Sequence, residues 1–183
     1  LAVSKLSYAD CFTQYLGVDP HSAELQVLRQ MAVAASSDSW ATETRANCLD
    51  LLFSFSIEPQ LPGGLVFIYD YPACQSALAQ IHLNDYGQAV SRRFEAFFNG
   101  MELANGYAEL TDANEQKFRF EKDIGQRLRD NKPAVAVDNK FIEALKSGLP
   151  PCAGVALGVD RLLMQLLAVE SIAQVMPFSW EHC

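Results

Sequence analysis

Two glutamates, Glu95 and Glu102, lie in a stretch whose pattern predicts a β-hairpin. Asn99-Gly100 separates two largely apolar runs, and this dipeptide favours a tight hairpin turn because both residues tolerate a positive φ. With a two-residue turn, the predicted cross-strand pairs are Phe98 with Met101, Phe97 with Glu102, and Glu95 with Ala104. The two carboxylates then share one face as diagonal neighbours within about 7–8 Å of each other.

Two carboxylates at this spacing repel each other unless water screens them or a cation lies between them. Mg²⁺ is typically held by one or two carboxylates together with substrate phosphates, so the pair could hold Mg²⁺ beside a nucleotide. The same pattern also fits two glutamates that are simply solvated on an exposed face. The pattern alone leaves both interpretations open.

The other face of the predicted hairpin is apolar throughout, because successive side chains along a strand alternate between faces. Its members are Phe94, Ala96, Phe98, Met101 and Leu103. We expect this face to be packed against another part of the protein.

A second candidate site lies near the end of the chain. A strand of small residues, Gly154–Leu157, leads through Gly158 into a helix predicted to start near Asp160. A helix N-terminus attracts anions, and Arg161 in the first turn adds a fixed charge and bidentate donors. This arrangement favours a phosphate site, although a glycine at such a junction is often only a turn.

The elements that must position these residues follow from periodicity and capping signals. The pattern over residues 1–60 predicts three helices. The first runs from a cap at Ser7 to Gly17, the second begins at Ser22, and the third includes residues 48–55. The pattern over residues 61–183 predicts a sheet whose first strand is a buried strand over 65–71.

Further signals divide the second half of the chain. Asn105-Gly106 predicts a second turn, Asp112 predicts the cap of a helix over 113–130, and Asp138 predicts the cap of a helix that ends at Gly148. These helices separate the hairpin from the strand at 154–157.

The composition is that of a globular protein, with 183 residues, half of them hydrophobic, and a net charge of −8. The acidic balance argues against extended contact with phosphate backbones. Five scattered cysteines without a Cys-x-x-Cys pair favour reduced thiols in a cytoplasmic protein over a zinc site or a disulfide framework. We see no signal peptide or membrane-length apolar run, and the missing initiator methionine suggests a fragment.

Taken together, residues 93–110 and 154–161 resemble the C-terminal half of the class II lysyl-tRNA synthetase catalytic domain, the second segment being similar to motif 3. Within that superfamily the chain most resembles the elongation factor P–lysine ligase family, and the resemblance extends over essentially all of the chain. It implies an α+β fold in which helices flank an antiparallel sheet. Residues 1–183 would form the C-terminal portion of a single catalytic domain.

The resemblance also implies roles for individual residues. The residues matching a Mg²⁺-binding pair are Glu95 and Glu102. Those matching ATP-binding positions are Glu102, Leu103 (through its backbone), Gly158 and Arg161, of which Glu102 and Arg161 are implied to be catalytic. Those matching amino-acid-binding positions are Asn105, Tyr107, Glu109 and Ala156, with Glu109 as the anchor of a substrate ammonium group.

Ala156 departs from the lysyl-tRNA synthetase pattern, which usually has glycine at this position. An additional methyl in a pocket is worth about 1–3 kcal/mol, so Ala156 would bias selection towards β-lysine rather than make it absolute. Motifs 1 and 2 are missing from the chain. We therefore expect the isolated chain to be inactive.

The implied reaction of the whole protein uses ATP and Mg²⁺ to activate (R)-β-lysine as its adenylate and transfers the acyl group to a lysine of elongation factor P. The whole protein is expected to be a homodimer that does not bind a membrane or tRNA. Two alternatives stay open: a fragment of a lysyl-tRNA synthetase that charges tRNA, and a non-catalytic paralogue.

Overall fold

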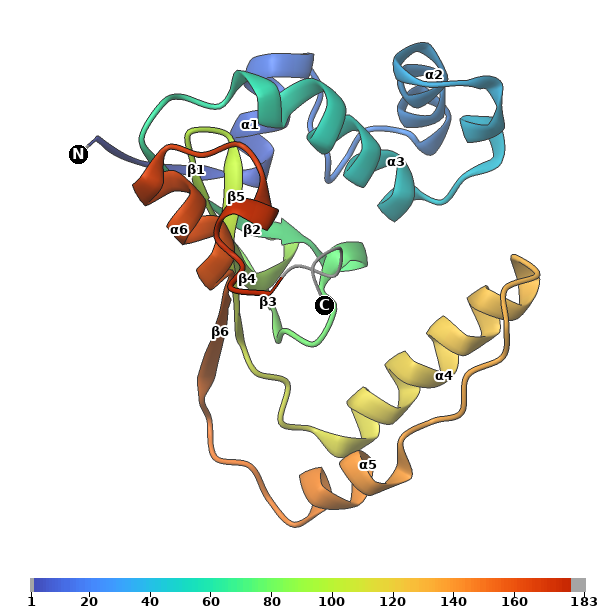
Figure 1. Cartoon of the computed structure of the whole chain (residues 1–183). Helices are drawn as coiled ribbons and strands as arrows, with labels where there is room; N and C mark the ends of the chain where they lie inside the picture. The colour runs from blue at the N-terminus through green and yellow to red at the C-terminus, as the bar shows by residue number, and fades with distance from the viewer. Residues whose placement is uncertain (1, 179–183) are drawn as a thin grey trace.

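A mixed six-stranded sheet forms the centre of the protein in a computed structural model that describes residues 2–178 (Figure 1). The strands are β1 (Val3–Ser7), β2 (Leu65–Pro72), β3 (Ile81–Leu83), β4 (Ala89–Phe98), β5 (Met101–Ala108) and β6 (Ala153–Leu157). Their order is β1-β2-β4-β5-β6, and β3 pairs with β4. Only the β1–β2 pair is parallel among these pairings, so the predicted α+β class and mainly antiparallel sheet are confirmed.

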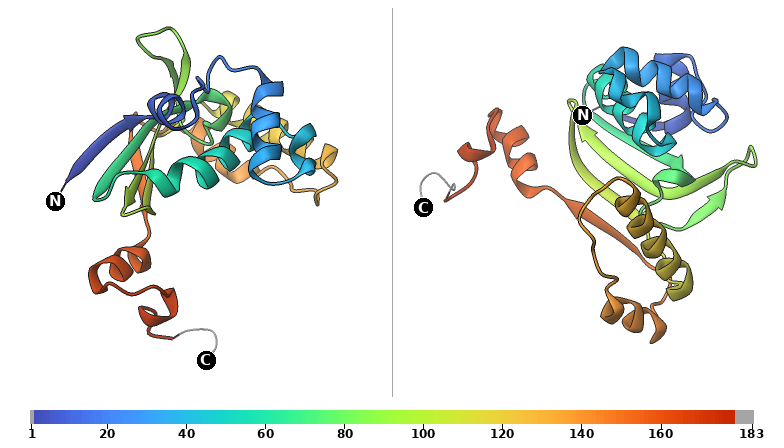
Figure 2. Two further views of the ribbon diagram at one scale, coloured as in Figure 1. Left: turned by 90° about the horizontal axis from the view of Figure 1, so that it is seen from above. Right: turned by 90° about the vertical axis from the view of Figure 1, so that its right-hand side faces the viewer.

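The helices lie in three groups. Helices α1 (Tyr8–Leu16), α2 (Leu25–Ala35) and α3 (Arg45–Leu52) cover part of one sheet face (Figure 2). Helices α4 (Ala113–Arg129) and α5 (Asn139–Lys146) form an arm between β5 and β6, and α6 (Val159–Leu167) follows β6. Short helical turns lie at Asp38–Thr42, Phe53–Ile57, Glu58–Gln60, Ala73–Gln75 and Ile172–Gln174. None of the helices within residues 2–178 is long and apolar enough to cross a bilayer.

Several predicted helix boundaries are confirmed by cap geometry. Ser7 and Asp10 form a reciprocal capping box at the start of α1, which ends at Gly17 in the left-handed conformation. The side chain of Asp112 accepts hydrogen bonds at the start of α4, and Asp138 does the same for α5.

The prediction that residues 1–60 are helical was wrong at the beginning of the chain. Val3–Ser7 forms a strand because it pairs in parallel with β2, a long-range contact that local periodicity cannot reveal. The second helix starts at Leu25 rather than at Ser22, because the Ser22 hydroxyl donates a hydrogen bond to Asp19 (2.7 Å) in the preceding turn.

The hairpin forms where it was predicted, but its register changes partway along. Asn99 and Gly100 have φ values of 48° and 79°, and both predicted pairs nearest the turn are present. Beyond them a β-bulge makes Leu103 an extra residue, so Glu95 pairs with Asn105 instead of Ala104. The predicted turn at Asn105-Gly106 was also wrong, since both residues lie inside β5.

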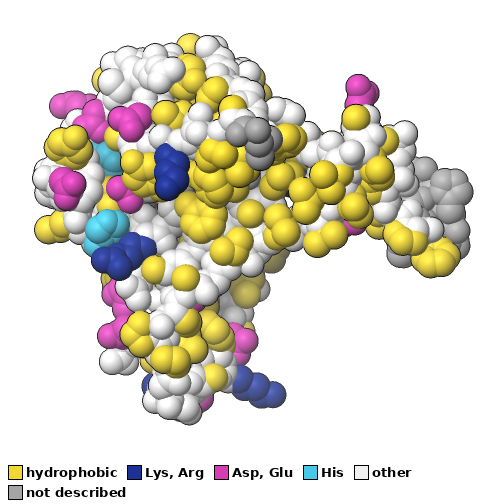
Figure 3. Space-filling view, turned by 90° about the vertical axis from the view of Figure 1, so that its left-hand side faces the viewer, with side chains coloured by type: hydrophobic (Ala, Val, Ile, Leu, Met, Phe, Trp, Pro, Cys, Tyr) yellow, Lys and Arg dark blue, Asp and Glu magenta, His cyan; other side chains and the backbone are white. Residues whose placement is uncertain are grey.

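The expectation that the apolar hairpin face is packed is confirmed only in part: Ala96 and Leu103 are buried, whereas Phe94, Phe98 and Met101 are half-buried. Phe97 and Glu95 face α1–α3 together with Val66 and Ile68 on β2, and the main core lies on that side. The opposite face is open within residues 2–178: Tyr69 is 40% exposed and Val155 59% exposed. Hydrophobic side chains accordingly form a broad band on that side of the molecule (Figure 3).

Candidate active site

Glu95 and Glu102 line one pocket of about 280 Å³ between the sheet and the end of α3. The face they share is the one predicted from the hairpin. Other polar or aromatic side chains that line this pocket include Asp50, Glu58, Tyr71, Arg93, Phe97 and Asn105. The pocket therefore combines acidic groups with a buried arginine, and it is bordered by the core aromatics.

Glu95 is the centre of a buried network, which we define as Tyr71, Arg93, Glu95 and Asn105. The Tyr71 hydroxyl donates to Glu95 Oε2 (2.7 Å), and Asn105 Nδ2 donates to Glu95 Oε1 (3.0 Å). Arg93 forms an ion pair with the same carboxylate, of which only 11% is exposed. Burial, with the charge of Glu95 as a second cause, raises the pKa of Tyr71 well above its usual range. The charge of Glu95 is thus compensated and its orientation is restrained.

Arg93 has further contacts that hold it in this position. Its guanidinium lies 4.5 Å from the ring centroid of Tyr71 and 5.9 Å from that of Tyr107. Its Nη1 donates to the carbonyl oxygen of Gln75 (2.9 Å). An arginine between two aromatic faces is favourably placed, because the ring faces carry partial negative charge.

The network also orients the Asn105 amide. A carboxylate can only accept hydrogen bonds, so Nδ2 of Asn105 must face Glu95. The Asn105 Oδ1 atom is buried without a hydrogen-bond partner among the described residues. It is therefore available to accept a hydrogen bond from a ligand.

The second part of the site is an open edge, which we define as Glu102, Gly158 and Arg161. Arg161 Nη1 donates to the Glu102 carbonyl oxygen (2.8 Å) and lies 3.4 Å from Glu102 Oε2. The backbone N–H of Gly158 donates to the Leu103 carbonyl (2.8 Å), so the start of α6 adjoins the bulge. A second pocket of about 390 Å³ is lined by members of this edge and by Asn105 and Ala156. The two predicted segments are thus brought together.

Strand β6 completes the wall of the site. Ala156 pairs with Asn105 and Gly154 pairs with Tyr107, so their side-chain positions lie on the same face as Glu95. A Cβ atom at Gly154 would lie 2.5 Å from Glu109 Oε1, which shows that the Glu109 carboxylate occupies the space that this glycine leaves. Asn105 and Tyr107 thus pair with β6, and the side chain of Glu109, which follows β5, lies against β6 at Gly154.

Glu58 is a site residue that the sequence did not indicate. It follows the π-helical turn Phe53–Ile57, which continues α3 and which has no recognisable sequence signal. Burial raises the pKa of the Glu58 carboxyl, and the charges of Glu102 and Glu95 raise it further. Arg93 was also missed, although its spacing of two from Glu95 on one strand could have indicated a shared face.

No three His, Cys, Asp or Glu side chains converge on a metal-binding position within residues 2–178. A pair of carboxylates still fits Mg²⁺, because this ion commonly takes one or two carboxylates and completes its shell with phosphate oxygens and water. Three donors already occupy the Glu95 carboxylate, which offers roughly four acceptor positions. Glu102 is the more accessible of the two.

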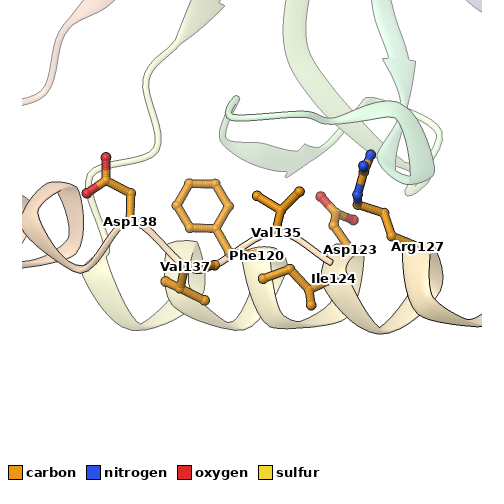
Figure 4. A pocket seen from close by; sticks show the side chains of 8 residues that line it. Phe120, Asp123, Ile124, Arg127, Val135, Val137 and Asp138 are labelled. Atoms are coloured by element: carbon orange, nitrogen blue, oxygen red, sulfur yellow. The ribbon is translucent and has the colours of Figure 1, made fainter. Parts of the chain in front are cut away.

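Two other features lie outside this site. The Cys74 thiol has a pKa raised by burial, which does not fit an activated nucleophile. A separate pocket of about 380 Å³ runs along the arm and contains no predicted site residue (Figure 4). Its lining includes Phe120, Asp123, Ile124, Arg127, Val135 and Val137.

Comparison with known proteins identifies the family of this chain. The family model for class II tRNA synthetases of the D, K and N type matches residues 3–182. The chain is 46% identical over 182 residues to an elongation factor P–(R)-β-lysine ligase from Proteus mirabilis (strain HI4320), covering 97% of this chain. It spans 55% of the length of that relative. With its sheet, its paired carboxylates and its glycine–arginine segment, the chain belongs to the class II tRNA synthetase family.

Proposed function

We propose that the protein containing this chain activates (R)-β-lysine with ATP and transfers the acyl group to a lysine of elongation factor P. The observation that carries the proposal is the contact between Arg161 and Glu102 at a pocket that continues to Asn105 and Ala156. One side of this pocket suits a phosphate chain with its metal ion, and the other suits an amino acid. The name of the Proteus relative supports the choice of substrates.

The open edge would bind ATP. Arg161 would neutralise phosphate charge, and Gly158 leaves room for a nucleotide, since a Cβ atom there would meet other atoms only at 3.5 Å or more. The Leu103 carbonyl accepts a hydrogen bond from Gly158, and the backbone of Leu103 would lie beside the nucleotide. Mg²⁺, bound by Glu102 with Glu95 as the second carboxylate, would neutralise charge on the phosphates.

The amino acid would lie over β5 and β6. Glu109 supplies a carboxylate for an ammonium group, and Asn105 Oδ1 supplies a buried acceptor. Tyr107 would line the same face as these two groups. Ala156 adds a methyl beside Asn105, and we propose that this methyl favours β-lysine over lysine.

The chemistry requires no covalent nucleophile from the enzyme. The substrate carboxylate oxygen bonds to the α-phosphorus of ATP as pyrophosphate leaves, and the acceptor amine then bonds to the carbonyl carbon as AMP and a proton leave. The chain's contribution is to position the reactants and to stabilise charge. A homodimer in the cytoplasm remains our prediction for the whole protein.

The experiment is lysine-dependent pyrophosphate exchange in the full-length protein with Glu102→Gln. We expect the exchange rate to fall about 10²-fold or more, by analogy with the removal of one charge-stabilising group from other enzymes. The matched control is Glu121→Gln on the exposed side of α4, which should keep full exchange. Unchanged exchange in Glu102→Gln would contradict the site assignment.

Transfer to the acceptor distinguishes the proposal from a tRNA-charging enzyme. Purified elongation factor P should gain one β-lysyl mass when it is incubated with the full-length protein, ATP and β-lysine. Acylation of tRNA without modification of elongation factor P would overturn the proposed acceptor.

A further inference from the structure

Arg119 on α4 is a largely buried arginine that lines neither pocket of the candidate site. Its side chain is 13% exposed, and its Nε donates to Glu115 Oε1 on the same helix (2.9 Å). Its Nη1 lies within hydrogen-bond distance of three oxygens of one loop: Ser76 Oγ (3.2 Å), Ala77 O (3.1 Å) and Ala79 O (2.8 Å). One guanidinium therefore joins the base of the arm to the segment Ser76–Ala79.

This segment needs such support. Ala77 has a φ of 46°, a left-handed conformation that a non-glycine residue keeps only when its surroundings impose it. The side chain of Ser76 is buried, and so is Ala79. The carbonyl groups that Arg119 binds belong to this strained turn, so the guanidinium satisfies acceptors that the turn itself leaves unpaired.

This segment and the next residue, Gln80, hold the backbone around Glu109. Leu110 N donates to Leu78 O (2.9 Å), and Gln80 N donates to Ala108 O (2.9 Å), which places one bond on each side of Glu109. Gln80 Nε2 donates to the carbonyl of Glu109 itself (2.9 Å). The position of Glu109 therefore depends on where this segment lies.

The loop also reaches the buried network. Gln75, the residue before the segment, accepts a hydrogen bond from Arg93 through its carbonyl (2.9 Å). A shift of the loop would thus move the partner of Arg93 as well as the backbone of Glu109. Both are on the amino-acid side of the site, whereas no hydrogen bond within residues 2–178 joins Glu102 or Arg161 to this loop.

We propose that Arg119 is a positioning residue for the amino-acid pocket, which it orders by holding the segment Ser76–Ala79 against Glu109. The proposal rests on the proposed function, in which Glu109 binds the substrate ammonium group. It predicts that loss of Arg119 weakens use of the amino acid and leaves use of ATP nearly unchanged.

The test compares Arg119→Ala with Arg129→Ala in the full-length protein. Arg129 lies on the same helix, and its guanidinium bonds only to Gln126 of that helix among the described residues. Pyrophosphate exchange is measured with β-lysine varied at saturating ATP, and then with ATP varied at saturating β-lysine. We expect Arg119→Ala to raise KM for β-lysine about tenfold, to change KM for ATP less than twofold, and to affect kcat less than the amino-acid KM. Arg129→Ala should change neither KM.

Amide hydrogen exchange gives a readout that does not depend on activity. In Arg119→Ala, the amides of Gln80 and Leu110 should exchange at least tenfold faster, while those of β2 should keep their protection. If Arg119→Ala does not fold, Ser76→Ala and Arg119→Lys receive the same two measurements, with smaller expected changes.

Equal increases in both KM values, or unchanged exchange of the Gln80 and Leu110 amides, would overturn the role of Arg119. This failure is distinguishable from failure of the proposed function. The latter appears as undiminished pyrophosphate exchange in Glu102→Gln, whereas the hydrogen-exchange result reports on the loop whatever substrate the protein uses.

Discussion

The two halves of the candidate site differ in how tightly the protein holds them. In the buried network, Glu95 is 11% exposed and has three donors from three different residues. In the open edge, the side chains of Glu102 and Arg161 are 36% and 51% exposed, and their direct side-chain contact is 3.4 Å long. One half is organised by the fold, and the other is accessible to solvent and to a ligand.

This difference has a physical cause. The network lies on the neighbouring strands β2, β4 and β5, where α1–α3 exclude water and a charge must therefore be paired. The open edge lies where β6 leads into α6, at the border of the sheet. We expect the network to contribute to stability and to amino-acid binding, and the edge to contribute to catalysis with little effect on stability.

The largest expected effect is a difference between Glu95 and Glu102 in how much their replacement by alanine lowers the stability of the fold. Glu95→Ala leaves Arg93 buried without its counterion and should lower the free energy of unfolding by about 3 kcal/mol. Glu102→Ala removes an exposed side chain and should change it by less than about 0.5 kcal/mol. Urea unfolding of both variants measures the difference. Equal losses would show that the two halves are not held differently.

The next effect concerns the border between the halves, at Gly154. A Cβ atom there would lie 2.5 Å from Glu109 Oε1, so Gly154→Ala should displace the carboxylate and raise KM for the amino acid about 10- to 100-fold. KM for ATP should stay within about twofold of its original value. Gly63→Ala is the matched control, because a Cβ atom there meets its first neighbour at 3.9 Å. An unchanged amino-acid KM in Gly154→Ala would exclude Glu109 as the anchor.

A smaller effect is expected at Ala156, which lines the pocket of the open edge beside Asn105. Ala156→Gly removes one methyl and should shift the ratio of kcat/KM for lysine over β-lysine upwards by about tenfold. Competition between the two substrates in the exchange assay measures this ratio. A constant ratio would remove Ala156 from the specificity of the site.

The smallest expected effect concerns Glu58, whose charge is repelled by Glu95 of the buried network and by Glu102 of the open edge. Burial and the charges of Glu102 and Glu95 raise its folded-state pKa above the unfolded value of about 4.3, so the ionised group opposes folding at neutral pH. Glu58→Gln should therefore raise the urea midpoint at pH 7. The gain should vanish below about pH 4, where the carboxyl is protonated in both states. A gain that is the same at both pH values would rule out this charge effect.

Local signals in the sequence were sufficient for the hairpin turn, the helix caps and the shared face of Glu95 and Glu102. Turn and capping chemistry involves residues within a few positions of one another, so such signals can be read directly. The resemblance added the roles of Glu109, Ala156 and Arg161. The structure places Ala156 and Arg161 in the lining of one pocket, and Glu109 against Gly154 further along β6.

The register beyond the bulge was decided by tertiary structure. Asn105 rather than Ala104 lies opposite Glu95, because the extra residue at Leu103 shifts every later pair by one. The sequence had predicted this stretch as a turn. Without the bulge, the Asn105 amide would point to the other face and could not bond to Glu95.

The sequence by itself determined that Glu95 and Glu102 share one face of a hairpin and that Gly158 and Arg161 lie at a junction between a strand and a helix. Side-chain alternation and helix capping are local properties, so they can be read from neighbouring residues. Only the tertiary structure decided which sheet face became the core, that Val3–Ser7 joins β2, and that Arg119 reaches the loop beside Glu109. Each of these depends on contacts between residues far apart in sequence. Hydrophobicity alone predicts that a face can be buried but not whether helices of the same chain will cover it.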